Sequence, residues 1–108
     1  MTTTTDTIGP FRFSIASVAE AERRLNLKIS QIIAEIESDD GMALRTLVAL
    51  VAAGSPPAGI PAYLADVAVA TWADQAHIDA ARLIKRHGTA ATAAAVGPDF
   101  GAFLLSIQ

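Results

Sequence analysis

Residues 11–54 constrain the fold more than any other part of the chain, because their apolar side chains fall into regular patterns. At the start of this stretch Phe11, Phe13 and Ile15 alternate with polar residues. A period of two predicts a short extended or β segment with one buried face. A single strand is not stable by itself. The segment must therefore pair with another part of the chain, pair with a second copy, or lie as an extended arm on helices.

Helical spacing follows this segment. Ser17 and Glu20 have the spacing of a capping box, which predicts a helix that begins at Ser17 and ends near Leu25, before Asn26. An amphipathic helix is predicted next, because four isoleucines repeat at i, i+3, i+4 and i+7, namely Ile29, Ile32, Ile33 and Ile36.

A third helix is expected in the centre of the fold, because residues 42–51 are apolar nearly all round. The polar turn at 38–41 is expected to end the preceding helix and to cap this one, with Asp39 and Asp40 at its N-terminus. Gly54 suits the position just after its C-terminal end.

The segment 54–61 is predicted to be an internal loop, since its prolines and glycines cannot continue a helix. Pro61 suits the first position of the next helix. Helical spacing then extends to His87 and fits one helix or two. A weak capping pattern formed by Thr71 and Asp74 favours two helices, with the break between these residues.

The C-terminal part is predicted to hold a short alanine-rich helix over 89–96, closed by Gly97 and Pro98. A last amphipathic segment follows, with apolar residues on one face: Phe100, Phe103, Leu104 and Ile107. The whole chain is thus expected to be mainly α. We predict a bundle of five to seven short helices in one domain over 11–108, preceded by a flexible tail at 1–10 and including one short N-terminal extended or β segment.

Composition points to an interaction with another protein. Hydrophobic residues make up 52% of the 108 residues, but many of them are alanines, which bury little area each. Apolar surface that a small core leaves uncovered is often covered by a partner. We therefore expect a protein partner or a homo-oligomer.

Charge and sequence pattern argue against several other classes. The net charge of −3 disfavours nucleic-acid binding, which normally needs a basic face. The chain lacks cysteine, which excludes disulfides and thiolate metal sites. The N-terminus has no secretory pattern, and no apolar run is long enough for a membrane span. We expect a cytoplasmic protein.

Candidate chemical groups are sparse, and we expect no enzymatic activity, cofactor or metal. Asp74 and His77 share a helical face, but a metal site of this kind normally needs a second such helix. An acidic cluster is expected to be solvated, namely Glu35, Glu37, Asp39 and Asp40. A basic cluster is expected to complement the end of a helix dipole, namely Arg82, Lys85, Arg86 and His87.

Two further features concern recognition. Residues 29–51 have the lengths of a helix-turn-helix, although only Arg45 and Thr46 would be available to read DNA bases. A small helical DNA-binding or regulatory protein is therefore the alternative function. The apolar face at the C-terminus suits either core packing or partner docking. The candidate partner-binding residues are Trp72, Phe100, Phe103, Leu104 and Ile107.

Residues 11–54 also resemble the small tail assembly chaperones of long-tailed bacteriophages and gene transfer agents. The similarity lies in the extended segment, in the acidic helix 19–25, in Leu27 and the isoleucines that follow, and in the helix that ends with small residues at 48–54. The resemblance implies a non-enzymatic protein that binds the apolar helices of a tape-measure protein, or tail-tube subunits, during tail assembly.

Overall fold

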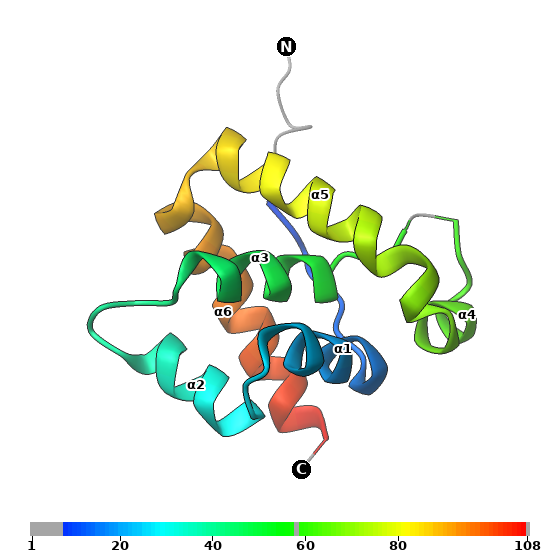
Figure 1. Ribbon diagram of the computed structural model, residues 1–108, viewed down its shortest axis with the longest axis horizontal. Coiled ribbons are helices and arrows are strands. Elements are labelled where there is room, and N and C mark those ends of the chain that lie inside the picture. The colour runs from blue at the N-terminus through cyan, green and yellow to red at the C-terminus, as the bar shows by residue number, and fades with distance from the viewer. Residues whose placement is uncertain (1–7, 58, 108) are drawn as a thin grey trace.

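The computed structural model describes residues 8–57 and 59–107, without the side chains of residues 62 and 63. In these ranges the chain is mainly helical, as predicted, and contains no strand. Six helices are present there: α1 (Ile15–Leu25), α2 (Ile29–Glu37), α3 (Leu44–Ala53), α4 (Ala62–Val67), α5 (Val69–His87) and α6 (Thr89–Ser106). Helix α3 lies in the middle of the fold and packs against α1, α5 and α6 (Figure 1).

The alternating N-terminal segment is an extended arm, the third of the predicted alternatives. The Arg12 amide donates a hydrogen bond to the Gly54 carbonyl at 2.8 Å, and the Phe11 amide donates to Asp99 Oδ2 at 2.9 Å. Phe11 is buried, and Ile8 also packs against the core. Residues 1–7 of the predicted tail lie outside the described residues. The arm thus joins the end of α3 to α6.

Helix α1 begins earlier than predicted, and the capping box at Ser17 and Glu20 is wrong. Ser14 is the N-cap: its hydroxyl accepts from the Ser17 amide at 3.1 Å, and the Ser17 hydroxyl accepts from the Ser14 amide at 3.0 Å. A serine hydroxyl can accept this hydrogen bond as a glutamate would. Because the helix includes Ile15, this residue does not share the buried face of the arm and is 68% exposed. Asn26 ends α1 in the left-handed conformation (φ 55°), as expected.

The start of α3 also differs from the prediction. The helix begins at Leu44, so Asp39 and Asp40 do not cap it; both are exposed. The Ala43 amide instead donates to Glu35 Oε1 of α2 at 3.0 Å. That hydrogen bond lowers the pKa of Glu35, with a further contribution from the positive charge of Arg45. A side chain from the preceding helix therefore satisfies an amide at the start of α3.

The central position predicted for α3 is confirmed, because seven of its ten residues are buried. Gly54 follows α3 with φ −89°, which any residue can adopt. Its lack of a side chain is needed for space: a Cβ there would lie 2.8 Å from Phe11 Cβ and 2.9 Å from Phe13 Cζ. The glycine therefore serves the close approach of the arm and is not a left-handed cap.

Two helices follow the loop, but they meet at Ala68, so the break predicted between Thr71 and Asp74 is wrong. Pro61 is the N-cap of α4 and not its first residue. Thr71 lies inside α5, where its hydroxyl donates to the Ala68 carbonyl at 2.6 Å. Tertiary packing sets the break, since the buried Trp72 donates its indole N–H to the Ala65 carbonyl of α4 at 3.1 Å.

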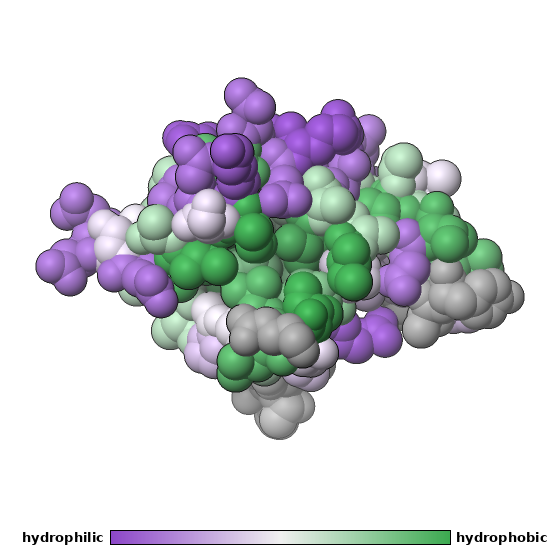
Figure 2. Space-filling view, turned by 90° about the horizontal axis from the view of Figure 1, so that it is seen from below, coloured by the Kyte–Doolittle hydropathy of each residue, from purple (hydrophilic) through white to green (hydrophobic). Residues whose placement is uncertain are grey.

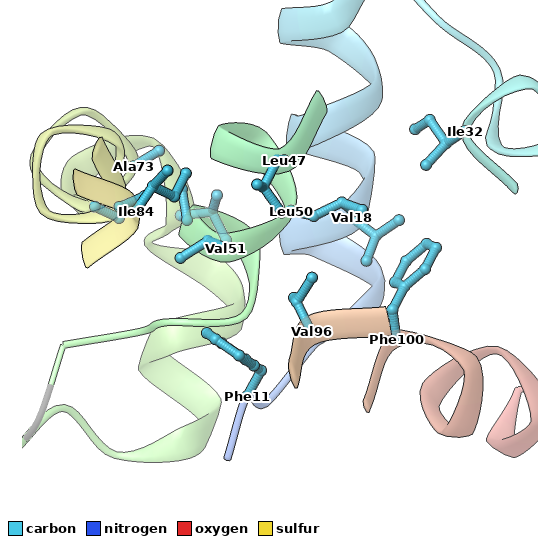
Figure 3. Packing of buried hydrophobic residues seen from close by; sticks show 14 of the residues in the cluster. Phe11, Val18, Ile32, Leu47, Leu50, Val51, Ala73, Ile84, Val96 and Phe100 are labelled. Carbon is cyan, nitrogen blue, oxygen red and sulfur yellow. The ribbon is translucent and has the colours of Figure 1, made fainter. Parts of the chain in front are cut away.

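Helix α6 runs unbroken through Gly97 and Pro98, contrary to the prediction of two segments. Pro98 and Ala94, whose carbonyl loses its amide partner, are both exposed, so water can hydrate that carbonyl. The opposite face holds the helix together, because three residues at four-residue spacing are buried: Thr92, Val96 and Phe100. Figure 3 shows Val96 and Phe100 pointing from α6 into the core.

Candidate protein-binding site

The five predicted partner-binding residues separate into two groups. Trp72 and Phe100 are core residues, 5% and 1% exposed. The Phe100 ring packs edge-on against Phe13 of the arm, with ring centroids 5.2 Å apart. Phe103 and Leu104 are half-buried, and Ile107 is 49% exposed. Only the last turns of α6 therefore offer predicted residues directly to a partner.

The three residues at the end of α6 line a groove of about 190 Å³ between α1, α2 and α6. Helix α1 contributes Ile15 and Ala19, α2 contributes Ile29, and α6 contributes the residues Phe103, Leu104 and Ile107. Apart from Glu22, the lining is apolar. The groove is therefore suited to bury apolar side chains of another molecule.

A second groove, of about 720 Å³, lies on the other side of the N-terminal end of α1. It runs between α1 and α4, and its apolar lining includes Ile15, Ala19, Val67 and Trp72. Polar side chains also line it: Arg12, Ser14, Ser17 and Asp66. Val67, which is 80% exposed, forms part of the wall of this groove. Ile15 and Ala19 line both grooves, so the two are continuous across α1.

We call this continuous surface the docking face; its principal residues are Ile15, Ala19, Val67, Phe103, Leu104 and Ile107. Figure 2 shows this side of the molecule, where apolar residues gather in the middle and hydrophilic residues lie mainly above and to the left of them. Contiguous exposed apolar surface with a polar border is typical of protein–protein interaction sites.

Charged side chains connect α1, which carries Ile15 and Ala19 of the docking face, to a neighbouring helix. Glu20 pairs with Arg23 and Arg24, and the hydrogen bonds from these two arginines, Arg23 first, hold the pKa of Glu20 below its ordinary value. Arg24 also pairs with Asp74 of α5 at 2.5 Å. The network therefore links α1 to α5.

The structure does not bring the predicted Asp74 and His77 pair together as ligands. Asp74 is paired with Arg24, while His77 Nδ1 donates to the Ala73 carbonyl at 2.8 Å. Within residues 8–57 and 59–107, no cluster of three or more His, Asp or Glu side chains has a metal-binding arrangement.

The other charged clusters are spread out. Glu35 is bonded to Ala43, and the remaining acidic residues of its cluster are exposed. The basic residues lie near the end of α5, where Arg82 is 3.7 Å from Asp79. Of the two candidate DNA-reading residues, Arg45 is exposed and Thr46 is fully buried.

Sequence reasoning missed the contribution of α1 to the docking face. The alternating pattern predicts Ile15 on the buried side of a strand, and the predicted capping box begins the helix only at Ser17. A helix counted from Ser14 would have placed Ile15 and Ala19 on one exposed face, because they are four residues apart.

Comparisons with models of protein families, with curated proteins and with solved structures gave no match. None of the helices in the described part of the chain is both long and apolar enough to cross a membrane.

Proposed function

We propose that this chain is a non-enzymatic assembly chaperone or adaptor of the phage-tail type, which binds apolar helices of a tape-measure or tail protein. The observation that carries the proposal is the docking face, where Ile15 is 68% and Ile107 is 49% exposed beside an apolar groove. The resemblance of residues 11–54 to tail assembly chaperones agrees with this use of the surface.

An amphipathic helix laid across this face would bury its own apolar side together with that of the chain. Burial of apolar surface contributes about 25 cal/mol per Å². Ala19 and Ala16 on α1 are small, so a partner backbone can approach α1 closely, and the larger Ile15 and Ile107 would fill gaps between partner side chains. The geometry favours a helix as the partner over an extended strand, because the described residues offer no sheet edge.

Co-expression with a tape-measure segment tests the proposal. We expect the chain to keep that segment in the soluble fraction and to co-purify with it. The Ile107→Asp variant should lose this effect, because a carboxylate in the apolar groove would be desolvated on binding. Ile78→Asp is the matched control, since Ile78 is also an isoleucine, is 50% exposed, and lies on α5 outside both grooves.

Two outcomes would contradict the proposal. Equal loss of binding in both isoleucine variants would mean that the docking face is not the contact surface. A strongly salt-dependent shift of DNA in gel electrophoresis, without any effect on the tail segment, would favour the DNA-binding alternative.

A further inference from the structure

Helix α2 is attached to the rest of the fold along one face, which carries its four isoleucines. Of its nine residues only Ile32 is buried, at 0% exposure, and its other isoleucines are half-buried. In Figure 1, α2 lies at the edge of the molecule, between two non-helical connections. It therefore covers one side of the core without being surrounded by it.

The surface beneath α2 is continuous with the docking face. Ile32 belongs to the same core cluster as Val18, Leu50 and Phe100. Figure 3 shows Ile32 on the side of the core where Val18 and Phe100 lie. Ile29, one turn earlier on α2, lines the groove between α1 and α6. The groove already reaches Val18, and removal of α2 would therefore extend it toward Phe100.

Each end of α2 is fastened by one carboxylate. Glu22 of α1 accepts a hydrogen bond from the Ile29 amide at 2.7 Å, at the positive end of the α2 helix dipole. At the other end Glu35 accepts from the Ala43 amide at 3.0 Å. The connections beyond these points, 26–28 and 38–43, are not helical, so changes of their backbone angles could let α2 swing out.

We propose that α2 occupies a helix-binding site in the absence of a partner and that the partner helix displaces it. The proposal rests on the function proposed above and specifies what kind of helix the partner presents. The partner is an amphipathic helix with branched aliphatic residues at the spacing of the four isoleucines, because the site already fits such a helix. An amide in its first turn would donate to Glu22, which now accepts from the Ile29 amide of α2.

Hydrogen exchange with mass spectrometry tests the displacement. The probe is a synthetic peptide with the sequence of residues 26–40, isotope-labelled so that its fragments separate from those of the chain. When the full chain binds the peptide, we expect amides 29–37 of the chain to exchange faster, while α3 amides stay protected. Binding without this loss of protection, or no binding at all, would overturn the proposal.

Weakening one of the two hydrogen bonds that hold the ends of α2 should raise the apparent affinity of the chain for the peptide. Glu35→Gln weakens the bond to Ala43, so the open form is more populated and the apparent Kd falls, by roughly threefold to tenfold. Glu37→Gln is the matched control on the same helix, since Glu37 is exposed and makes no such bond. If the two variants bound the peptide with equal affinity, the hydrogen bond of Glu35 would not hold α2 over the binding site, which would contradict the proposal. Circular dichroism of both variants checks that they are folded.

The two proposals fail separately. Solubilisation of the tape-measure segment while amides 29–37 stay protected would overturn the displacement of α2 alone. Displacement of α2 by the peptide with no effect on any tail protein would overturn the proposed function alone.

Discussion

Helices α2 and α3 follow each other in the chain and have similar lengths, nine and ten residues, but they are held in different ways. Seven residues of α3 are buried, whereas α2 buries only Ile32. Helix α3 packs against α1, α5 and α6, while α2 is held by one buried isoleucine, three half-buried ones and two carboxylate hydrogen bonds. Two apolar helices of one chain thus differ in whether they build the core or cover it.

The difference teaches that apolar content does not decide the role of a helix. Helix α2 concentrates its isoleucines on one face, which allows one covered side and one open side. Helix α3 carries apolar residues nearly all round, so it is stable only when surrounded. Regions with few buried contacts open locally at lower free energy than the core.

The sharpest test compares Leu50→Ala with Ile32→Ala, since both side chains are 0% exposed. Leu50→Ala should lower the free energy of unfolding by about 2–5 kcal/mol, because it leaves a cavity in the surrounded helix. Ile32→Ala should lower the free energy of unfolding by less, because α2 can detach while the rest of the core stays packed. This variant should also reduce the helical circular dichroism signal. Urea unfolding measures both; equal costs with unchanged helicity would break the comparison.

Gly54 tests how firmly the end of α3 is fixed. Gly54→Ala should destabilise the protein by about 1–3 kcal/mol, because the new Cβ would overlap Phe11 and Phe13. Gly101→Ala is the control: nothing lies within 4 Å of a Cβ there, and the substitution should stabilise α6 by about 0.5–1 kcal/mol. Thermal unfolding of both variants measures the difference. A neutral Gly54→Ala would show that the arm can move away from α3.

Glu35 links the two helices and should show a pH dependence. Its pKa is lowered in the folded protein, so its bond to Ala43 stabilises the fold at neutral pH and is lost as the pH falls below 4.5 through the folded pKa. Glu35→Gln should reduce stability by less than about 1 kcal/mol at pH 7, because the group is partly exposed. The difference in free energy of unfolding between Glu35→Gln and the unmodified chain should shrink in acid. Unfolding curves measured at about every pH unit from pH 3 to 7 test this, and a difference that persists at pH 3 would contradict it.

The smallest effect is expected away from both helices, at Arg24. This side chain joins Glu20 of α1 to Asp74 of α5, but Asp74 is 83% exposed. Arg24→Gln should therefore cost about 0.5 kcal/mol or less and should leave the exchange of α2 amides unchanged. A faster exchange of α2 in this variant would show that the α1–α5 network also controls α2.

The positions of the helices were predictable where their apolar residues repeat on one face. The residues at which the helices begin and end were less predictable. The isoleucine spacing located α2, and Asn26 correctly marked the end of α1. The start of α1 was wrong because Ser14 and Ser17 offer competing caps, and local pattern does not choose between them. The continuity of α6 through Pro98 was missed because it depends on which side of the helix faces solvent.

The candidate site was predictable only in its C-terminal part. Ile107 and its neighbours on α6 were identified from their spacing, and they do line a groove. Trp72 and Phe100 were selected by the same criterion but are buried, since an apolar stripe looks alike whether it packs inward or outward.

The sequence by itself determined that the chain is mainly helical, which helix is central, and where the loop at 54–61 interrupts the pattern, because these follow from side-chain periodicity and from proline and glycine. The tertiary structure alone decided that the N-terminal segment is an arm, that Gly54 is needed for space, and that the grooves meet across α1. The reason is physical: periodicity fixes which residues share a face, but only packing fixes which faces remain open to solvent.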